Sequence, residues 1–109
     1  MFKIVSDPQF THDVPVMVPV DDGHAEQSLR TRFRVLDDEA RSAFDLTTPE
    51  GTKDFLHAAV VGFEGLVDDE EKPLPVTDAL REKLIGTPYV SSALSRHYFA
   101  ALYKARLGN

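Results

Sequence analysis

A chain of 109 residues is long enough for one domain with a single hydrophobic core. Its 42% apolar and 28% charged residues are typical of a folded domain rather than a disordered one, and the absence of cysteine excludes disulfides, cysteinyl zinc sites and thiol nucleophiles. The net charge of −6 disfavours general nucleic-acid binding, which needs a concentrated basic surface. Residues 1–7 lack the long apolar region of a signal peptide and no apolar run could span a membrane, so we expect a cytoplasmic protein.

A β-hairpin over residues 13–35 is the first predicted element. Valine occupies every second position from 14 to 20, which is the period of a half-buried strand. Pro15 and Pro19 place this strand at a sheet edge, because proline lacks the backbone donor that an inner strand needs. A turn at residues 21–24 leads to a second alternating strand, and residues 3–5 are expected to add a third, since an isolated hairpin is only marginally stable.

Beyond residue 36 the apolar spacing becomes helical. Acids at residues 37–39 favour a short first helix that ends near Leu46, because they interact favourably with the helix dipole. Thr48 and Pro49 are a typical N-cap and first helical residue, and they open a second helix. Its apolar stripe indicates one buried face made of Phe55, Leu56, Ala59, Val60 and Phe63.

Residues 62–77 predict an excursion to the surface and a return. Gly62 and Gly65 end the helix, the acids at 68–71 stay in solvent, and Leu74 between two prolines is expected to anchor the chain in the core. Thr77 caps a third helix that Gly86 closes.

Thr87 and Pro88 repeat the cap and proline pattern, and they open a last helix that runs to about residue 106. We therefore predict a single α+β domain over residues 1–109. An N-terminal β-hairpin or small antiparallel sheet at about 13–35 precedes about four helices at about 37–106, and the helices dominate.

Charge is unevenly distributed along the chain. Residues 64–71 contain five acids and no base. Residues 81–106 contain five bases and a single acid, Glu82. This polarity suits head-to-tail self-association or a charged partner, and a preference of cations for helix C-termini explains it equally well.

A catalytic, cofactor or metal site has no positive support in the sequence. His57 follows Asp54 by one helical turn and the two could pair for acid-base work, but a solvated pair explains them adequately. His12, His24 and His97 are too scattered to indicate a metal site. We expect no enzyme.

Two surfaces are predicted to bind a partner. Arg30, Arg32 and Arg34 form a basic ridge beside Met17 on the outer hairpin face, which an ordinary polar sheet face would also explain. Phe99 and Tyr103 share a side of the last helix, where they contact either a partner or the core.

The chain resembles the tail assembly chaperones of long-tailed phages and prophages over roughly residues 10–106. The resemblance rests on residues 14–20, 33–39, 54–56, 62–66 and 73–77, with a Gly-aromatic-Glu-Gly-aliphatic turn, acids and a Pro-Leu-Pro segment.

This resemblance implies a protein of the host bacterial cytoplasm that binds and solubilises the tape measure protein, promotes polymerisation of the major tail tube protein, and is absent from the mature virion. It also implies a longer form of the chain made by translational frameshift, and the codons of residues 107–109 can contain the slippery heptamer that such a shift needs. A homo-oligomer is a further expected partner state. A head-tail connector or tail terminator, an unrelated cytosolic adaptor, and an enzyme using His57 and Asp54 remain alternatives.

Overall fold

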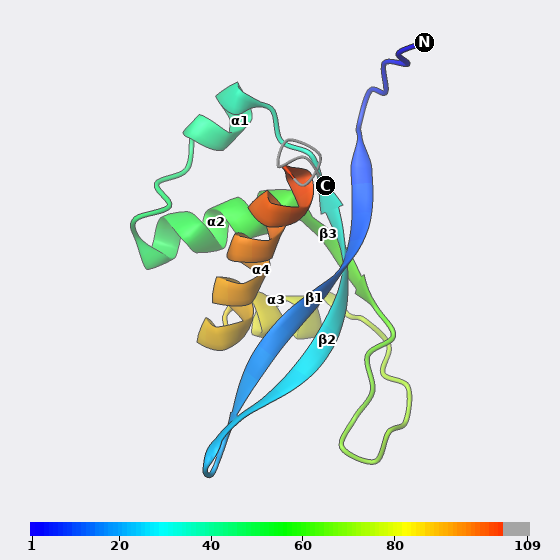
Figure 1. The fold of residues 1–109 in the computed structure, drawn as a ribbon, viewed down its shortest axis with the longest axis vertical. Coiled ribbons are helices and arrows are strands. Elements are labelled where there is room, and N and C mark those ends of the chain that lie inside the picture. The colour runs from blue at the N-terminus through cyan, green and yellow to red at the C-terminus, as the bar shows by residue number, and fades with distance from the viewer. Residues whose placement is uncertain (104–109) are drawn as a thin grey trace.

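The computed structural model describes residues 1–103 as a three-stranded antiparallel sheet with helices packed on one of its faces (Figure 1). Helices hold 38% of these residues and β structure 30%. The expected dominance of helices is therefore wrong, and the fold is mixed α+β. The elements in chain order are β1 (Gln9–Val20), β2 (Gly23–Arg34), α1 (Asp38–Ser42), α2 (Pro49–Ala59), β3 (Val60–Glu64), α3 (Asp78–Ile85) and α4 (Pro88–Leu102).

Strands β1 and β2 form the predicted hairpin, which begins four residues earlier than expected. The strands pair without interruption from Gln9 opposite Arg34 to Val20 opposite Gly23. The amide of Val35 donates to the carbonyl of Pro8 at 2.9 Å, so in this register the even-numbered residues of β1 bond to β2. Pro15 and Pro19 are odd-numbered and lie along the open edge of the sheet, where their missing donors cost no ladder bond. Their predicted edge position is confirmed.

The third strand is β3 and not residues 3–5. It follows α2 directly and pairs antiparallel with β2, with a bulge between Arg32 and Phe33. The second helix accordingly ends at Ala59 and not at the glycines of residues 62–65. Val60 and Phe63 are buried as predicted, but they reach the core from a strand.

Thr48 and Thr77 are confirmed as N-caps, and Asp37 caps the first helix in the same way. The side chains of Asp37, Thr48 and Thr77 each accept a hydrogen bond from a backbone amide in the first turn. Thr87 does not act as a side-chain cap, because its hydroxyl instead donates to the carbonyl of Lys83 at 2.7 Å. Helix α4 ends at Leu102 within the described residues. The predicted end of the last helix near residue 106 lies outside them.

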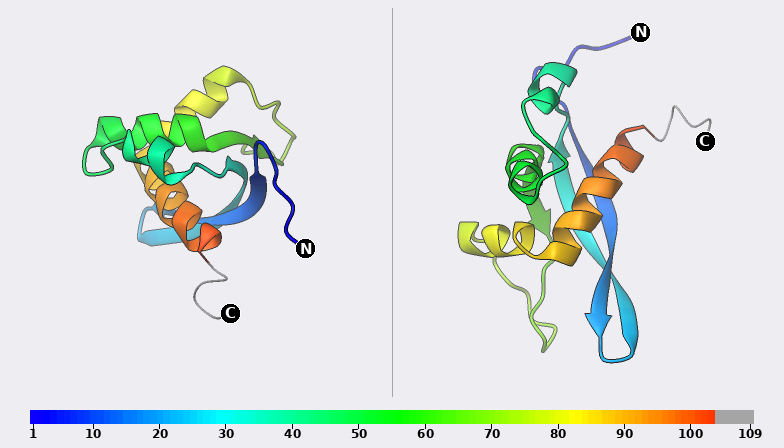
Figure 2. Two further views of the ribbon diagram at one scale, coloured as in Figure 1. Left: turned by 90° about the horizontal axis from the view of Figure 1, so that it is seen from above. Right: turned by 90° about the vertical axis from the view of Figure 1, so that its left-hand side faces the viewer.

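Helices α2 and α4 cover one face of the sheet, and the opposite face is open (Figure 2). An aromatic cluster fills the interface, with Tyr98 of α4 edge-on to Phe33 of β2 and to Phe55 of α2 at ring-centroid distances of 5.3 Å. All three side chains are fully buried, so they fix how α2 and α4 lie on the sheet. Among residues 1–103, no helix has both the length and the apolar character needed to cross a bilayer.

Candidate binding surfaces

The predicted arginine ridge lies on the open sheet face, but two of its three side chains form ion pairs with acids of the same chain. Arg30 contacts Asp13 of β1 at 3.0 Å and Glu64 of β3 at 3.2 Å, so it bridges all three strands. Arg34 contacts Asp7 at 2.9 Å and the carbonyl of Ala58 at 3.4 Å. Arg30 and Arg34 are therefore already engaged in contacts within the chain.

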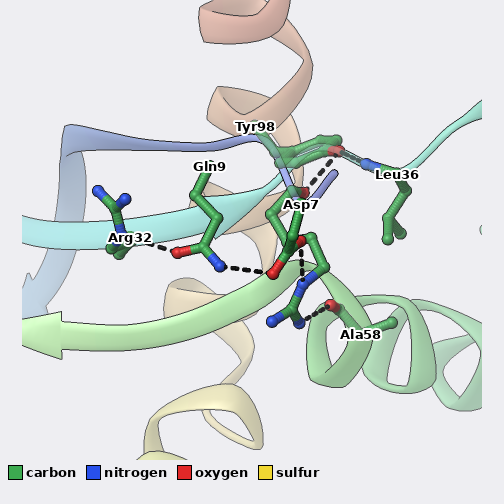
Figure 3. Close-up of polar contacts among 7 residues, drawn as sticks. Asp7, Gln9, Arg32, Leu36, Ala58 and Tyr98 are labelled. Atoms are coloured by element: carbon green, nitrogen blue, oxygen red, sulfur yellow. Dashed lines mark hydrogen bonds and ion pairs between the residues drawn. The ribbon is translucent and has the colours of Figure 1, made fainter. Parts of the chain in front are cut away.

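Neutral side chains hold the third arginine. The guanidinium of Arg32 donates to Gln9 at 2.9 Å (Figure 3). It also donates to the hydroxyl of Thr11 at 3.0 Å. Gln9 also donates to Asp7, and the hydrogen bonds from Arg34 and Gln9 lower the pKa of the Asp7 carboxyl. Within residues 1–103, Arg32 is the member of the ridge without an acidic partner.

Met17 lies further along the same face of β1, nearer the hairpin turn. Its side chain is exposed, as is that of Val20 at the hairpin tip. Met17 is thus available for contact, although the neighbouring surface on β2 carries Glu26 opposite it.

Phe99 and Tyr103 lie together on α4, on the helical side of the sheet. Their rings stack at a centroid distance of 6.5 Å, and Phe99 also stacks on the buried Phe55 at 5.5 Å. Both residues are half-buried. Phe99 therefore contributes one side of its ring to the core and leaves only part of its surface for a partner.

His57 contacts a different acid from the one that the sequence suggested. Its Nε2 atom hydrogen-bonds to Glu82 of α3, and its Nδ1 atom lies 2.8 Å from the carbonyl oxygen of Lys53. No hydrogen bond joins it to Asp54 in the part of the chain that the structure describes. The imidazole thus links α2 to α3 in this fold.

His12 of β1 and His97 of α4 stack across the interface between sheet and helix, at a centroid distance of 6.4 Å. Burial lowers the pKa of His97, and the nearby Arg96 and His12 lower it further. In the described part of the chain, no three histidine and acidic side chains gather as a metal site would require.

An apolar groove is the surface feature that the sequence did not predict. Its volume is about 410 Å³. It lies between the hairpin, the loop of residues 65–77, α3 and the start of α4. The apolar residues that line it are Val16, Val18, Leu29, Leu66, Val67, Leu74, Leu80, Leu84, Tyr89 and Val90.

Hydrogen bonds hold the loop of residues 65–77 as one wall of this groove. Gly65 takes the left-handed conformation (φ 69°) that starts the loop, and the amide of Leu74 donates to the carbonyl of Leu66 at 2.8 Å. At the far end of the loop, the carboxylate of Asp68 accepts from the amides of Glu70 and Lys72. The loop is therefore an ordered flap and not a loose linker.

Leu74 is not the core anchor that we predicted. Its side chain is 37% exposed, and it lines the groove. The two flanking prolines hold the segment extended, so the side chain of Leu74 lines the groove and does not enter the hydrophobic core. An apolar residue between prolines and beside an acidic run was the one signal of this surface in the sequence.

A second hollow of about 640 Å³ lies between the starts of α2 and α4. It is lined by Leu46, Pro49, Ile85 and Pro88 together with Lys53, Arg96 and several serine and threonine residues. Within residues 1–103 no buried side-chain polar atom lacks a hydrogen-bond partner, so this hollow contains no unpaired buried group that would hold a ligand. The apolar groove is the better candidate for a binding site.

No family model, curated protein or solved structure matches the chain.

Proposed function

We propose that this protein is a phage tail assembly chaperone that binds and shields the tape measure protein in the bacterial cytoplasm. The apolar groove is the observation that carries the proposal. A long helical partner with apolar stripes needs a small, charged shield whose own apolar surface is recessed, and the groove supplies such a surface.

The groove is suited in shape and charge to one side of an amphipathic helix. Leu80 and Leu84 lie one turn apart on α3, and Leu74 faces the same hollow from the loop. The acids of residues 68–71 are carried by the same loop. We infer that the groove accepts an apolar stripe and that the acids contact basic residues beside that stripe.

A co-expression experiment tests this function. A tape measure protein from the same genome should stay in the soluble fraction with the wild-type chain and aggregate with the Leu74→Asp variant, because a carboxylate in the groove opposes apolar contact. The matched control is Val20→Asp, which places the same charge at the exposed hairpin tip.

Equal solubility with both variants, each shown to be folded by circular dichroism, would exclude the groove as the client site. The proposal further expects purified phage particles to lack this chain. Its recovery from particles in a fixed ratio to tail proteins would instead favour a connector or tail terminator.

A further inference from the structure

Residues 1–5 form an exposed, largely apolar arm that belongs to no helix or strand of the fold. Phe2 and Ile4 in it are 90% and 92% exposed. No hydrogen bond, ion pair or ring contact joins the arm to the rest of residues 1–103. Apolar side chains this exposed in a charged protein are typical of an interaction site.

The arm cannot fold back into the groove of its own chain. Asp7 is held by Arg34, and Pro8 by the amide of Val35, so the chain is fixed in direction as it enters β1. The six residues before Asp7 span at most ~22 Å when extended, whereas Val16 at the groove lies nine residues along the chain from Asp7, or roughly 30 Å. Figure 1 shows the arm at one end of the molecule, and the hairpin tip and the loop of residues 65–77 at the other.

We propose that the arm of one copy occupies the apolar groove of a second copy. In an extended arm, Phe2 and Ile4 project to the same side and can enter the groove together. Lys3 projects to the other side, where the acids at 68–71 of the receiving loop supply the opposite charge. The groove volume of about 410 Å³ lies within the ~300–1,000 Å³ typical of sites that enclose a ligand.

This contact joins different surfaces of the two copies, so it is heterologous and propagates from one copy to the next. The arm and the tape measure protein then compete for one groove, and this competition rests on the proposed function. Self-association itself does not, since it needs only the arm and the groove.

Disulfide trapping tests the contact directly, because the chain has no cysteine of its own. The Val5→Cys and Val67→Cys proteins place one thiol on the arm and one at the groove, at exposed positions that leave the core intact. Mixing them under mild oxidation should give a crosslinked heterodimer. The control pair replaces Val67→Cys with Val20→Cys at the hairpin tip, and it should crosslink at least tenfold less.

Equal crosslinking in both mixtures, or a Val5→Cys homodimer as the main product, would overturn the proposal. Sedimentation equilibrium supplies an independent measurement. The wild-type chain should associate, and the double variant Phe2→Ser/Ile4→Ser should dissociate at least tenfold more readily while unfolding at the wild-type temperature.

A wild-type chain that stays monomeric up to millimolar concentration would likewise reject the arm contact. Both measurements omit the tape measure protein, so their failure leaves the proposed function standing. Conversely, a wild-type chain that self-associates through the arm but neither binds the tape measure protein nor keeps it soluble would reject the function and not the self-association.

Discussion

Tyr98 ties α4 to the point where the chain leaves the sheet. Its hydroxyl donates to the carbonyl of Arg34 at 3.1 Å and accepts from the amide of Leu36 at 3.0 Å, and the side chain is fully buried. Burial raises the pKa of this hydroxyl, so it stays protonated throughout the physiological range. One side chain therefore completes the packing of the aromatic cluster and pairs two backbone groups at the end of β2.

Replacing Tyr98 with phenylalanine should lower the free energy of unfolding by about 1–3 kcal/mol, because both backbone groups lose their partner while the ring stays packed. Urea unfolding with an unchanged m-value measures this loss. Tyr89→Phe is the matched control, since Tyr89 is 40% exposed, and it should change stability by less than about 0.5 kcal/mol. Equal effects of the two changes would mean that the Tyr98 hydroxyl contributes nothing.

Sequence periodicity predicted which side chains are buried better than it predicted their partners. Val60 and Phe63 were correctly predicted to be buried, but their place in a strand was not. The hydrogen bonds of the buried Tyr98 likewise reach residues more than 60 positions away. The same limit applies to His57, whose acid lies on α3 and not one turn along its own helix. A local pattern reports the side of an element that faces inward, and tertiary contacts then select the partner.

Among the elements, β3 shows why the helix content was overestimated. Val60 and Phe63 continue the apolar spacing of α2, so periodicity alone cannot distinguish a longer helix from a short strand. Pairing with β2 decides between them, because it joins residues about 30 positions apart and completes the sheet. Residues 3–5 have strand-forming residue types, yet they find no neighbouring strand to pair with.

The contact between α4 and β1 should make stability depend on pH through His97. Because the folded state lowers the pKa of His97 below 6.5, the unfolded chain binds more protons as the pH falls past this value. The contribution of His97 to the free energy of unfolding is therefore complete above about pH 6.5 and is lost as the pH falls through the lowered pKa.

Urea unfolding between pH 7.5 and pH 5 should show this loss in the wild type and a flatter profile in His97→Gln. His24→Gln is the control, because His24 is exposed in the hairpin next to the turn and should leave the profile unchanged. An identical slope in the wild type and in His97→Gln would show that His97 does not carry the pH dependence.

For the molecule as a whole, the fold class was predicted only in part. The hairpin, two helix caps and most core positions follow from the sequence, because alternation, capping residues and apolar stripes act locally. The ion pairs of the open sheet face and the groove do not, since each joins segments far apart in the chain. Charge is also arranged on this scale, because the open face brings Arg30, Arg32 and Arg34 of β2 together with Asp13 of β1 and Glu64 of β3.

Removing those cations gives a prediction about the whole molecule. The triple variant Arg30→Ser/Arg32→Ser/Arg34→Ser changes the net charge from −6 to −9, because three positive charges are lost. It also leaves Asp7, Asp13 and Glu64 without their ion-pair partners. The thermal midpoint should therefore fall slightly at low salt, and added salt should recover most of the loss by screening the repulsion among the remaining acids.

Thermal unfolding of the triple variant at about 0.02 M and 0.5 M salt measures this recovery, since the Debye length falls below ~10 Å above 0.1 M. The control is the triple lysine variant, which keeps the net charge at −6 and should show a smaller salt dependence. Self-association should stay at the wild-type level, because the arm and the groove use none of the three arginines. A midpoint loss that is equal at both salt concentrations would instead assign the arginines a packing role, and weaker self-association would place them in the contact between copies.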